Sequence, residues 1–381
     1  MDIYSVSDVF NESEVPVLTF VEPGEFNDIV GSLVTSGKHV TLSGPSGCGK
    51  TTLAKKSLDG AGFGPGNTHW ISGRDYSSES TTNGLFSKEF SCEDNNDEIV
   101  ECLQAAGIVI LDDFHHLQES VRNEIGYKLK RWHEQEIRFL VIGIASSSKK
   151  MLDIDSELGI RNDVYEMKRQ DDTFCEKVID LGEKHLNIKI STESRKQFVL
   201  AADGIPSAIQ VICRVACIRN KVLKTESDCK DISCQMEEIK DGVLRIYRGK
   251  YHNKLIGLCK GKQQARSVHN TYFDIIKNIS IIGKGEIHFQ EIQQRLLAPI
   301  TDTKEKAKKT TSFHNCLKYL PAVIEQRGLD DAIYVNRDSE TISIEDPSFG
   351  LYLNLIDLDE VGQSIKLRRT GSGIQIISAT L

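Results

Sequence analysis

Short apolar runs alternate with helix-like stretches over the first 170 residues of this 381-residue chain. The runs predicted as strands cover residues 38–43, 68–73, 108–111, 138–144 and 164–167. Between them, apolar residues recur at helical spacing, as Val121, Ile125 and Leu129 do in the stretch 118–134. The run 108–111 is unbroken and aliphatic, which is typical of a strand buried on both faces of a parallel sheet. The pattern therefore predicts an α/β domain with a parallel sheet and helices on both faces.

After residue 170 the pattern becomes mainly helical. Helices are predicted at 174–186, 192–202, 206–218, 239–257, 271–281, 290–296 and 313–327. A short strand is predicted at 285–289 and a hairpin at 332–335 and 341–344, an order that is typical of a winged-helix domain. Three further segments are predicted as a loose lead-in at 1–15, a basic turn at 301–311 and a polar surface insertion at 75–96, which only Leu85, Phe86 and Phe90 would anchor.

These patterns divide the chain into five predicted parts. They are a lead-in at 1–17, an α/β core at 18–170, a helical lid with its connecting helix at 171–262, a winged-helix domain at 263–358 and a tail at 359–381. The tail alternates apolar residues near 374–377 and is expected to add a strand to itself or to a partner.

A glycine-rich turn joins the first predicted strand to a helix. Its residues are Gly44-Pro45-Ser46-Gly47-Cys48-Gly49-Lys50-Thr51-Thr52, with the spacing G-x-x-x-x-G-K-[ST] of a phosphate-binding P-loop. The glycines let backbone N–H groups turn toward an anion, and the helix adds the positive end of its dipole. We expect Lys50 to reach the β- and γ-phosphates of ATP and the Thr51 hydroxyl to bind Mg²⁺. The whole turn is a predicted nucleotide site.

The run 108–111 ends in two acids, Asp112 and Asp113. An aliphatic strand that ends in this way about sixty residues after a P-loop is the Walker-B pattern. Asp112 is expected to act on Mg²⁺ through a bound water, and Asp113 to polarise the attacking water. His115 and His116 follow, but adjacent histidines at a helix start are expected to point in different directions. They are predicted to be partly buried or in polar contacts rather than to bind metal.

Composition narrows the function classes. A net charge of −8 argues against nonspecific coating of nucleic acid by the whole surface, though not against a local basic patch. The ten cysteines have no disulfide-framework or zinc-finger spacing and are expected to be reduced thiols. The first residues lack a signal-peptide pattern, and no apolar run reaches membrane-spanning length. A cytoplasmic protein with no membrane partner is predicted.

The two motifs, together with Ser146 after the fourth strand and Arg161 before the fifth, resemble the AAA+ superfamily. The sequences of segments 19–23, 44–47, 111–115 and 142–144 resemble those of origin-recognition initiators, transposition-regulator ATPases, STAND ATPases and prokaryotic defence-associated ATPases. In that superfamily Ser146 would sense the γ-phosphate, and Arg161 would reach the γ-phosphate of a neighbouring subunit. The alternative for Ser146 is an ordinary serine-rich turn, and the alternative for Arg161 is a surface arginine that caps the edge of the sheet. Residues 203–206 resemble the Gly-x-Pro turn of the lid, which places Pro206 at the nucleotide.

The resemblance implies an AAA+ α/β core, a helical lid and a C-terminal winged helix. It also implies a regulatory ATPase that uses ATP and Mg²⁺, forms a homo-oligomer and controls a separate effector protein in antiviral defence. Many relatives carry Glu at the position of Asp113, so hydrolysis is expected to be slow. Two alternatives stay open: a DNA-bound loader or transposition regulator, and a non-hydrolysing scaffold. The first would use the winged helix and the basic stretch 245–266, which also fits a solvated helix face.

Overall fold

The structure is a computed structural model that falls into two compact units. It describes residues 2–11, 15–35, 38–44, 47–143, 161–261, 270–283, 286–337, 339–365, 367–370 and 373–376. The first unit comprises residues 1–189, 203–210 and 223–230. The second unit comprises residues 190–202, 211–222 and 231–381.

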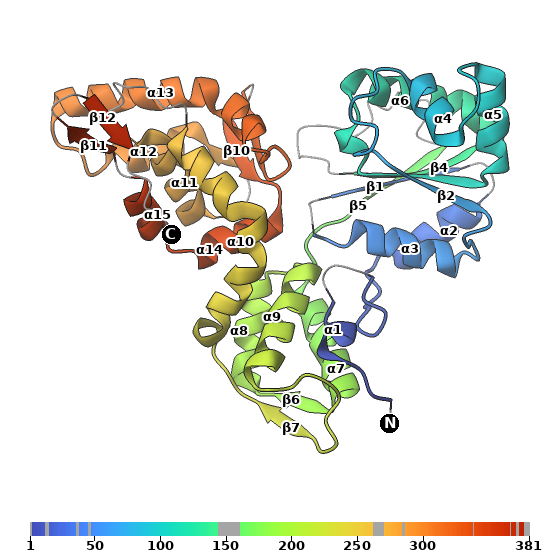
Figure 1. The fold of residues 1–381 in the computed structure, drawn as a ribbon, viewed down its shortest axis with the longest axis horizontal. Helices are drawn as coiled ribbons and strands as arrows, with labels where there is room; N and C mark the ends of the chain where they lie inside the picture. Colours follow the sequence, from blue (N-terminus) through green and yellow to red (C-terminus); the bar gives the residue numbers. More distant parts are fainter. Residues whose placement is uncertain are drawn as a thin grey trace. The chain divides into compact units, whose positions relative to one another are not determined.

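A five-stranded parallel sheet forms the centre of the first unit (Figure 1). Its strands are β1 His39–Ser43, β2 Thr68–Ser72, β3 Ile108–Asp112, β4 Arg138–Gly143 and β5 Asn162–Glu166. Their order is β2-β3-β4-β1-β5, and every pair is parallel. The predicted parallel α/β sheet is confirmed, and the strand ends agree with the predicted ones to within about two residues. Because the strands are parallel, the segments that follow β1 and β3 leave the sheet at the same edge.

Helices cover both faces of this sheet (Figure 1). One face holds α2 Phe26–Val34 and α3 Lys50–Gly60, and the other holds α4 Thr82–Phe90, α5 Asn96–Ala105 and α6 Glu119–Glu134. Side chains alternate along a strand, so Ile108 and Ile110 of β3 join the α2–α3 core while Val109 and Leu111 join the α4–α6 core. The four aliphatic residues of β3 thus serve two cores.

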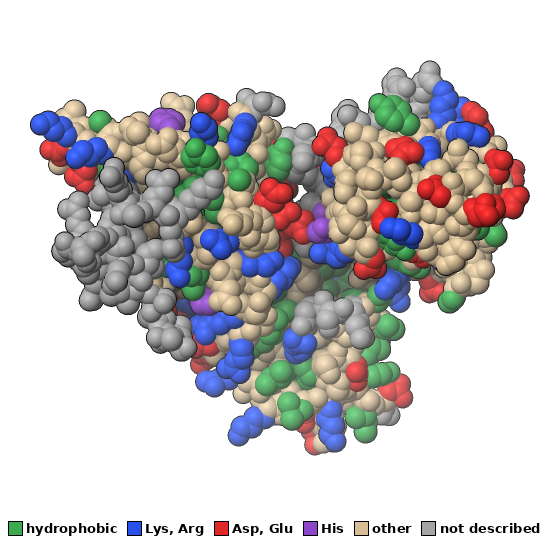
Figure 2. Space-filling view, turned by 45° about the horizontal axis from the view of Figure 1, so that its top comes forward, with side chains coloured by type: hydrophobic (Ala, Val, Ile, Leu, Met, Phe, Trp, Pro, Cys, Tyr) green, Lys and Arg blue, Asp and Glu red, His purple; other side chains and the backbone are tan. Residues whose placement is uncertain are grey.

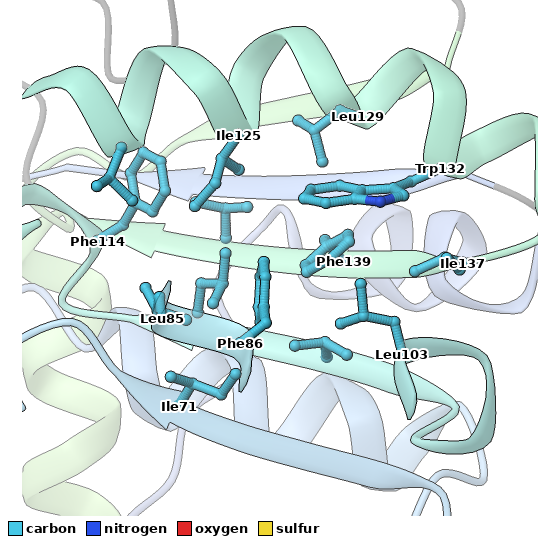
Figure 3. Packing of buried hydrophobic residues seen from close by; sticks show 14 of the residues in the cluster. Ile71, Leu85, Phe86, Leu103, Phe114, Ile125, Leu129, Trp132, Ile137 and Phe139 are labelled. Atoms are coloured by element: carbon cyan, nitrogen blue, oxygen red, sulfur yellow. The ribbon is translucent and has the colours of Figure 1, made fainter. Parts of the chain in front are cut away.

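The segment 75–96 contributes to the α4–α6 core, so its prediction as a surface insertion is wrong, whereas the predicted anchors Leu85, Phe86 and Phe90 are confirmed. Leu85 and Phe86 of α4 are fully buried. The Phe86 ring lies edge-on to Trp132 of α6 at 5.7 Å between centroids and 6.1 Å from the Phe139 ring of β4 (Figure 3). These few large side chains anchor a segment whose other residues are mostly polar.

The N-terminal residues are also packed, so the loose lead-in predicted at 1–15 is wrong where the structure describes it. A short helix, α1 Val6–Val9, is followed by Phe10, which is fully buried. The Phe10 ring lies against Gly182 of α7 (Asp172–Leu186), where an added Cβ would come within 2.0 Å of the ring. Tyr4 N donates to Thr225 Oγ1 at 2.9 Å. Contacts distant in sequence therefore hold this segment.

The remaining elements follow in sequence from residue 188 onward. They are β6 Ile188–Ile190, α8 Thr192–Ala202, α9 Pro206–Arg219, β7 Lys230–Ile232, α10 Met236–Lys260, α11 Thr271–Ile282, β8 Ile287–His288, α12 Phe289–Leu297, α13 Thr303–Gln326, β9 Ile333–Asn336, β10 Thr341–Ile344, α14 Pro347–Leu355, α15 Leu358–Ser364, β11 Leu367–Thr370 and β12 Gly373–Ile376. In the second unit β8, β10 and β9 form an antiparallel sheet in that order. Strands β11 and β12 pair with each other, as predicted for a tail that adds a strand to itself.

The basic turn predicted at 301–311 is instead the first part of α13. The Asp302 side chain caps this helix by accepting from Glu305 N at 2.7 Å. Lysine is a good helix former, so the four lysines of this segment favour the helix. Within the part of the chain that the structure describes, no helix is both long enough and apolar enough for a membrane span.

Candidate nucleotide-binding site

The P-loop backbone has the conformation that its glycines allow. Gly44, Gly47 and Gly49 have φ values of 146°, 76° and 90°. At Gly44 an added Cβ would lie 2.5 Å from the carbonyl oxygen of Met167, so a larger residue is excluded by contact as well as by φ. Pro45 and Ser46 lie outside the described residues. The loop therefore starts with a tight turn at the end of β1.

The P-loop lysine lies back over this loop. Helix α3 begins at Lys50, and Lys50 Nζ donates to the Gly44 carbonyl at 2.8 Å. The Cys48 Sγ is 4.0 Å from the same Nζ. Burial raises the pKa of the Cys48 thiol, so this group stays uncharged at neutral pH and does not repel a phosphate. The ammonium group of Lys50 and the backbone N–H groups at the start of α3 together form a site that can bind a phosphate.

The Walker-A threonine and the first Walker-B acid meet directly. Thr51 Oγ1 donates to Asp112 Oδ2 at 3.0 Å, although β4 separates β1 from β3 in the sheet. Burial raises the pKa of the Asp112 carboxyl, and hydrogen bonds from Asp113 N and Thr51 offset this only in part. A hydroxyl beside a desolvated carboxylate is a donor set that Mg²⁺ accepts, and a cation there would relieve the cost of burying the charge. The residues present fit the predicted Mg²⁺ site.

Asp113, the second acid, is held by a residue that the motifs did not indicate. Arg74 Nε donates to Asp113 Oδ2 at 2.6 Å, and both side chains are partly exposed. Asp113 has a left-handed backbone, with φ 54°, and its N–H donates to Asp112 Oδ1 at 2.8 Å. Gly73 N donates to the Asp112 carbonyl at 2.8 Å, which brings the end of β2 against this turn. Arg74 and Asp113 are 39 residues apart, so only the β2–β3 pairing could have indicated the contact.

His115 and His116 lie together, so the prediction that they point in different directions is wrong. Their ring centroids are 4.3 Å apart. They belong to a 3₁₀ turn, η1 Phe114–His116, and not to the start of α6. Ligand atoms of the two histidines and of Asp113 all lie within 4.8 Å of one another.

The other predicted site residues are not all brought to this edge of the sheet. Ser146 lies outside the described residues. The carbonyl of Arg161 accepts from His39 N at 2.9 Å, at the start of β1, whereas the P-loop follows its end. Arg161 therefore lies toward the opposite edge of the sheet from the P-loop of its own chain.

Pro206 begins α9, and the turn before it is connected to the P-loop. Gln170 N donates to the Gly204 carbonyl at 2.8 Å, three residues after Met167, which contacts Gly44. Arg169 also forms an ion pair with Asp203. The contacts in this unit thus link the Gly-x-Pro turn to the first glycine of the P-loop.

A P-loop after β1 and an acid pair after β3, joined through Thr51 and Asp112, define the class of P-loop nucleoside triphosphatases. Residues 40–169 match the model of the ATPase family associated with various cellular activities (AAA). The match supports an AAA ATPase domain in this segment, in agreement with the predicted fold of the core and with the assignment as an ATPase.

Several solved structures are similar to this chain at low sequence identity. The Walker-type ATPase paby2304 of Pyrococcus abyssi is 15% identical, with a TM-score of 0.52 over 88% of this chain and 99% of that one. The Aeropyrum pernix Orc1 protein, solved in complex with DNA, is 14% identical, with a TM-score of 0.48 over 93% and 96%. The RuvB Holliday junction branch migration motor of Thermotoga maritima is 15% identical, with a TM-score of 0.41 over 90% and 97%. A search of curated proteins finds no match.

Proposed function

We propose that this chain is a regulatory ATPase of the AAA+ and STAND type, in which binding and slow hydrolysis of Mg²⁺·ATP control assembly and a partner effector. The observation that carries the proposal is the 3.0 Å hydrogen bond between Thr51 and Asp112, next to Lys50 above the P-loop. It brings together the groups that a triphosphate and its cation require.

The residues have distinct roles in this proposal. The loop 44–52 and Lys50 bind the phosphates, and Thr51 with Asp112 would hold the Mg²⁺, which neutralises phosphate charge when bound. Asp113 orients and polarises the attacking water as a general base. The hydrogen bond from Arg74 Nε occupies one oxygen of Asp113. Release of that contact is therefore a step before hydrolysis, which supports a slow basal rate.

Two substitutions test these roles. Lys50→Ala should abolish ATP binding, whereas Asp113→Asn should keep binding and block phosphate release, since it removes the base and leaves the P-loop intact. Lys55→Ala, on the exposed side of the same helix α3, is the matched control and should retain both properties. ATP binding with no phosphate release in the unmodified protein, unchanged by Asp113→Asn, would instead support the non-hydrolysing scaffold.

We extend the proposal to homo-oligomers through Arg161. Because Arg161 lies beside the start of β1, its part in hydrolysis would be in the site of a second copy. Arg161→Ala should then lower turnover most at protein concentrations where copies assemble. Turnover that is unchanged at every concentration would exclude this role. Control of an effector in antiviral defence rests on the motif resemblance, and pull-down of a partner in the ATP state tests it.

A second candidate function is DNA binding by the C-terminal unit. The order α11, β8, α12, α13, β9, β10 supports the proposed winged-helix domain at 263–358, and Arg245 and Arg248 of α10 are exposed. Against it, Lys250 pairs with Asp346, and basic side chains are interspersed with acidic ones over the face in Figure 2. Salt-sensitive DNA binding that is lost in the double variant Arg245→Glu/Arg248→Glu would support this function.

A further inference from the structure

Three side chains with metal-ligand chemistry converge next to the proposed nucleotide site. They are Asp113, His115 and His116, each partly buried, with ligand atoms within 4.8 Å of one another. A 3₁₀ helix has three residues per turn, so residues i and i+3, here Asp113 and His116, lie on the same side. The turn therefore brings Asp113 and His116 to one side, and the His115 ring lies 4.3 Å from the His116 ring between centroids.

The turn that carries these side chains is anchored in the core of the first unit by a buried residue. Phe114 lies between them in sequence and is fully buried in the α4–α6 core, where Figure 3 shows its ring beneath α6. His116 N donates to the Asp113 carbonyl at 2.9 Å, and Leu117 N donates to the Phe114 carbonyl at 3.2 Å. A backbone anchored in this way keeps the three ligands on one face at little entropic cost.

The donor set selects a different cation from the one expected at Thr51 and Asp112. Mg²⁺ prefers oxygen ligands, whereas imidazole suits Zn²⁺, Co²⁺ and Ni²⁺. Ligand atoms about 2.0–2.1 Å from a tetrahedral Zn²⁺ lie about 3.3 Å from one another. The ligand atoms of the three side chains lie within 4.8 Å of one another, so side-chain rotations that shorten these distances by up to about 1.5 Å would complete the geometry. Arg74 contacts Oδ2 of Asp113, and a carboxylate has a second oxygen that can accept a cation.

We propose that Asp113, His115 and His116 form a binding site for a divalent d-block cation such as Zn²⁺, with the remaining coordination positions open to water. A cation bound there holds the carboxylate of Asp113 and prevents it from polarising the attacking water. Cation binding stands on the geometry alone, whereas inhibition of hydrolysis rests on the role proposed for Asp113. The site would make ATP turnover sensitive to Zn²⁺ while leaving ATP binding intact.

Titration of the full-length, nucleotide-free protein with Co²⁺ tests the site without reference to activity. We expect a saturable visible d–d spectrum without the near-ultraviolet band of cobalt thiolate, and competition by Zn²⁺. His115→Gln and His116→Gln should each weaken Co²⁺ binding at least about tenfold, because even loss of an outer-shell partner costs 10–100-fold. His314→Gln, an exposed histidine on α13, is the matched control and should bind as the unmodified protein does.

Two further variants separate this site from its rivals. Asp112→Asn should keep the Co²⁺ signal, because the proposed Mg²⁺ site uses Asp112, and Cys92→Ser should keep it, because the site has no thiolate. Co²⁺ binding that survives both histidine substitutions, or that is lost with Asp112 or Cys92, would overturn the proposal, as would the absence of a saturable spectrum. His115→Gln should also make phosphate release resistant to Zn²⁺. Normal Co²⁺ binding without Zn²⁺ inhibition would leave the site standing and refute the role of Asp113.

Discussion

Removal of the Arg74 guanidinium is expected to speed basal ATP hydrolysis. Arg74 Nε donates to Asp113 Oδ2 at 2.6 Å. Arg74→Ala leaves that oxygen to water, so a larger fraction of molecules has Asp113 ready to act on the attacking water. Lys50, Thr51 and Asp112 keep their contacts, so the KM for ATP should change little.

The exposure of this ion pair sets the size of the effect. The Arg74 side chain is 55% exposed and the Asp113 side chain 35% exposed. Such partly exposed pairs contribute up to about 1 kcal/mol, and 1.4 kcal/mol corresponds to a tenfold change in an equilibrium. We therefore expect kcat to rise by at most about fivefold. Because salt screens exposed charges, the difference from the unmodified protein should shrink as ionic strength increases.

Phosphate release at saturating Mg²⁺·ATP measures this rate. Lys88→Ala removes another exposed ion pair of the same segment, between Lys88 and Glu79, and serves as the control with unchanged kcat. If Arg74→Ala lowers kcat, Arg74 assists hydrolysis and does not restrain it. An equal rise in the Lys88→Ala variant would show that the segment as a whole, and not the contact with Asp113, limits the rate.

Three other outcomes are expected. Burial raises the pKa of Asp112 in the folded state, so the free energy of unfolding falls as pH rises from the unfolded pKa of this group to its folded pKa. In thermal melts across pH without nucleotide, Asp112→Asn should therefore raise the Tm at neutral pH, and it should remove the stabilisation by Mg²⁺·ATP. Gly204→Ala, with φ 69° and an added Cβ 1.9 Å from the Gln170 oxygen, should destabilise more than Gly62→Ala, with φ 80° and open space, which should cost about 1–2 kcal/mol in denaturant titrations. Phe86→Ala should cost about 3–5 kcal/mol by the same measurement.

The sheet could be predicted from the sequence because its signals are local. Strand β3 is aliphatic at four successive positions, and the P-loop spacing after β1 is specific for phosphate. The acid pair after β3 was indicated by the aliphatic run before it and by its distance in sequence from the P-loop. Lys50, Thr51 and Asp112 were all indicated by motifs that lie within single segments, and the structure brings them together.

Other features depend on contacts that no single segment reveals. Phe86 stands among polar residues, and its burial depends on Trp132 and Phe139 from α6 and β4. The contact of Arg74 with Asp113 requires the β2–β3 pairing. The closeness of His115 and His116, whose ring centroids are 4.3 Å apart, depends on how the two side chains are rotated, which adjacency in the sequence does not fix.

The contact between Tyr4 and Thr225 spans 221 residues of sequence. During synthesis on a ribosome, Phe10 and its neighbours emerge long before Gly182 and Thr225 exist. At ~20 residues per second the delay is on the order of 10 s, during which the apolar side chains of this opening segment have no native partner. The nascent chain would therefore expose these side chains to chaperones. A tag fused next to Tyr4 would interfere with the contact between Tyr4 and Thr225, which is among the last contacts of the first unit to form.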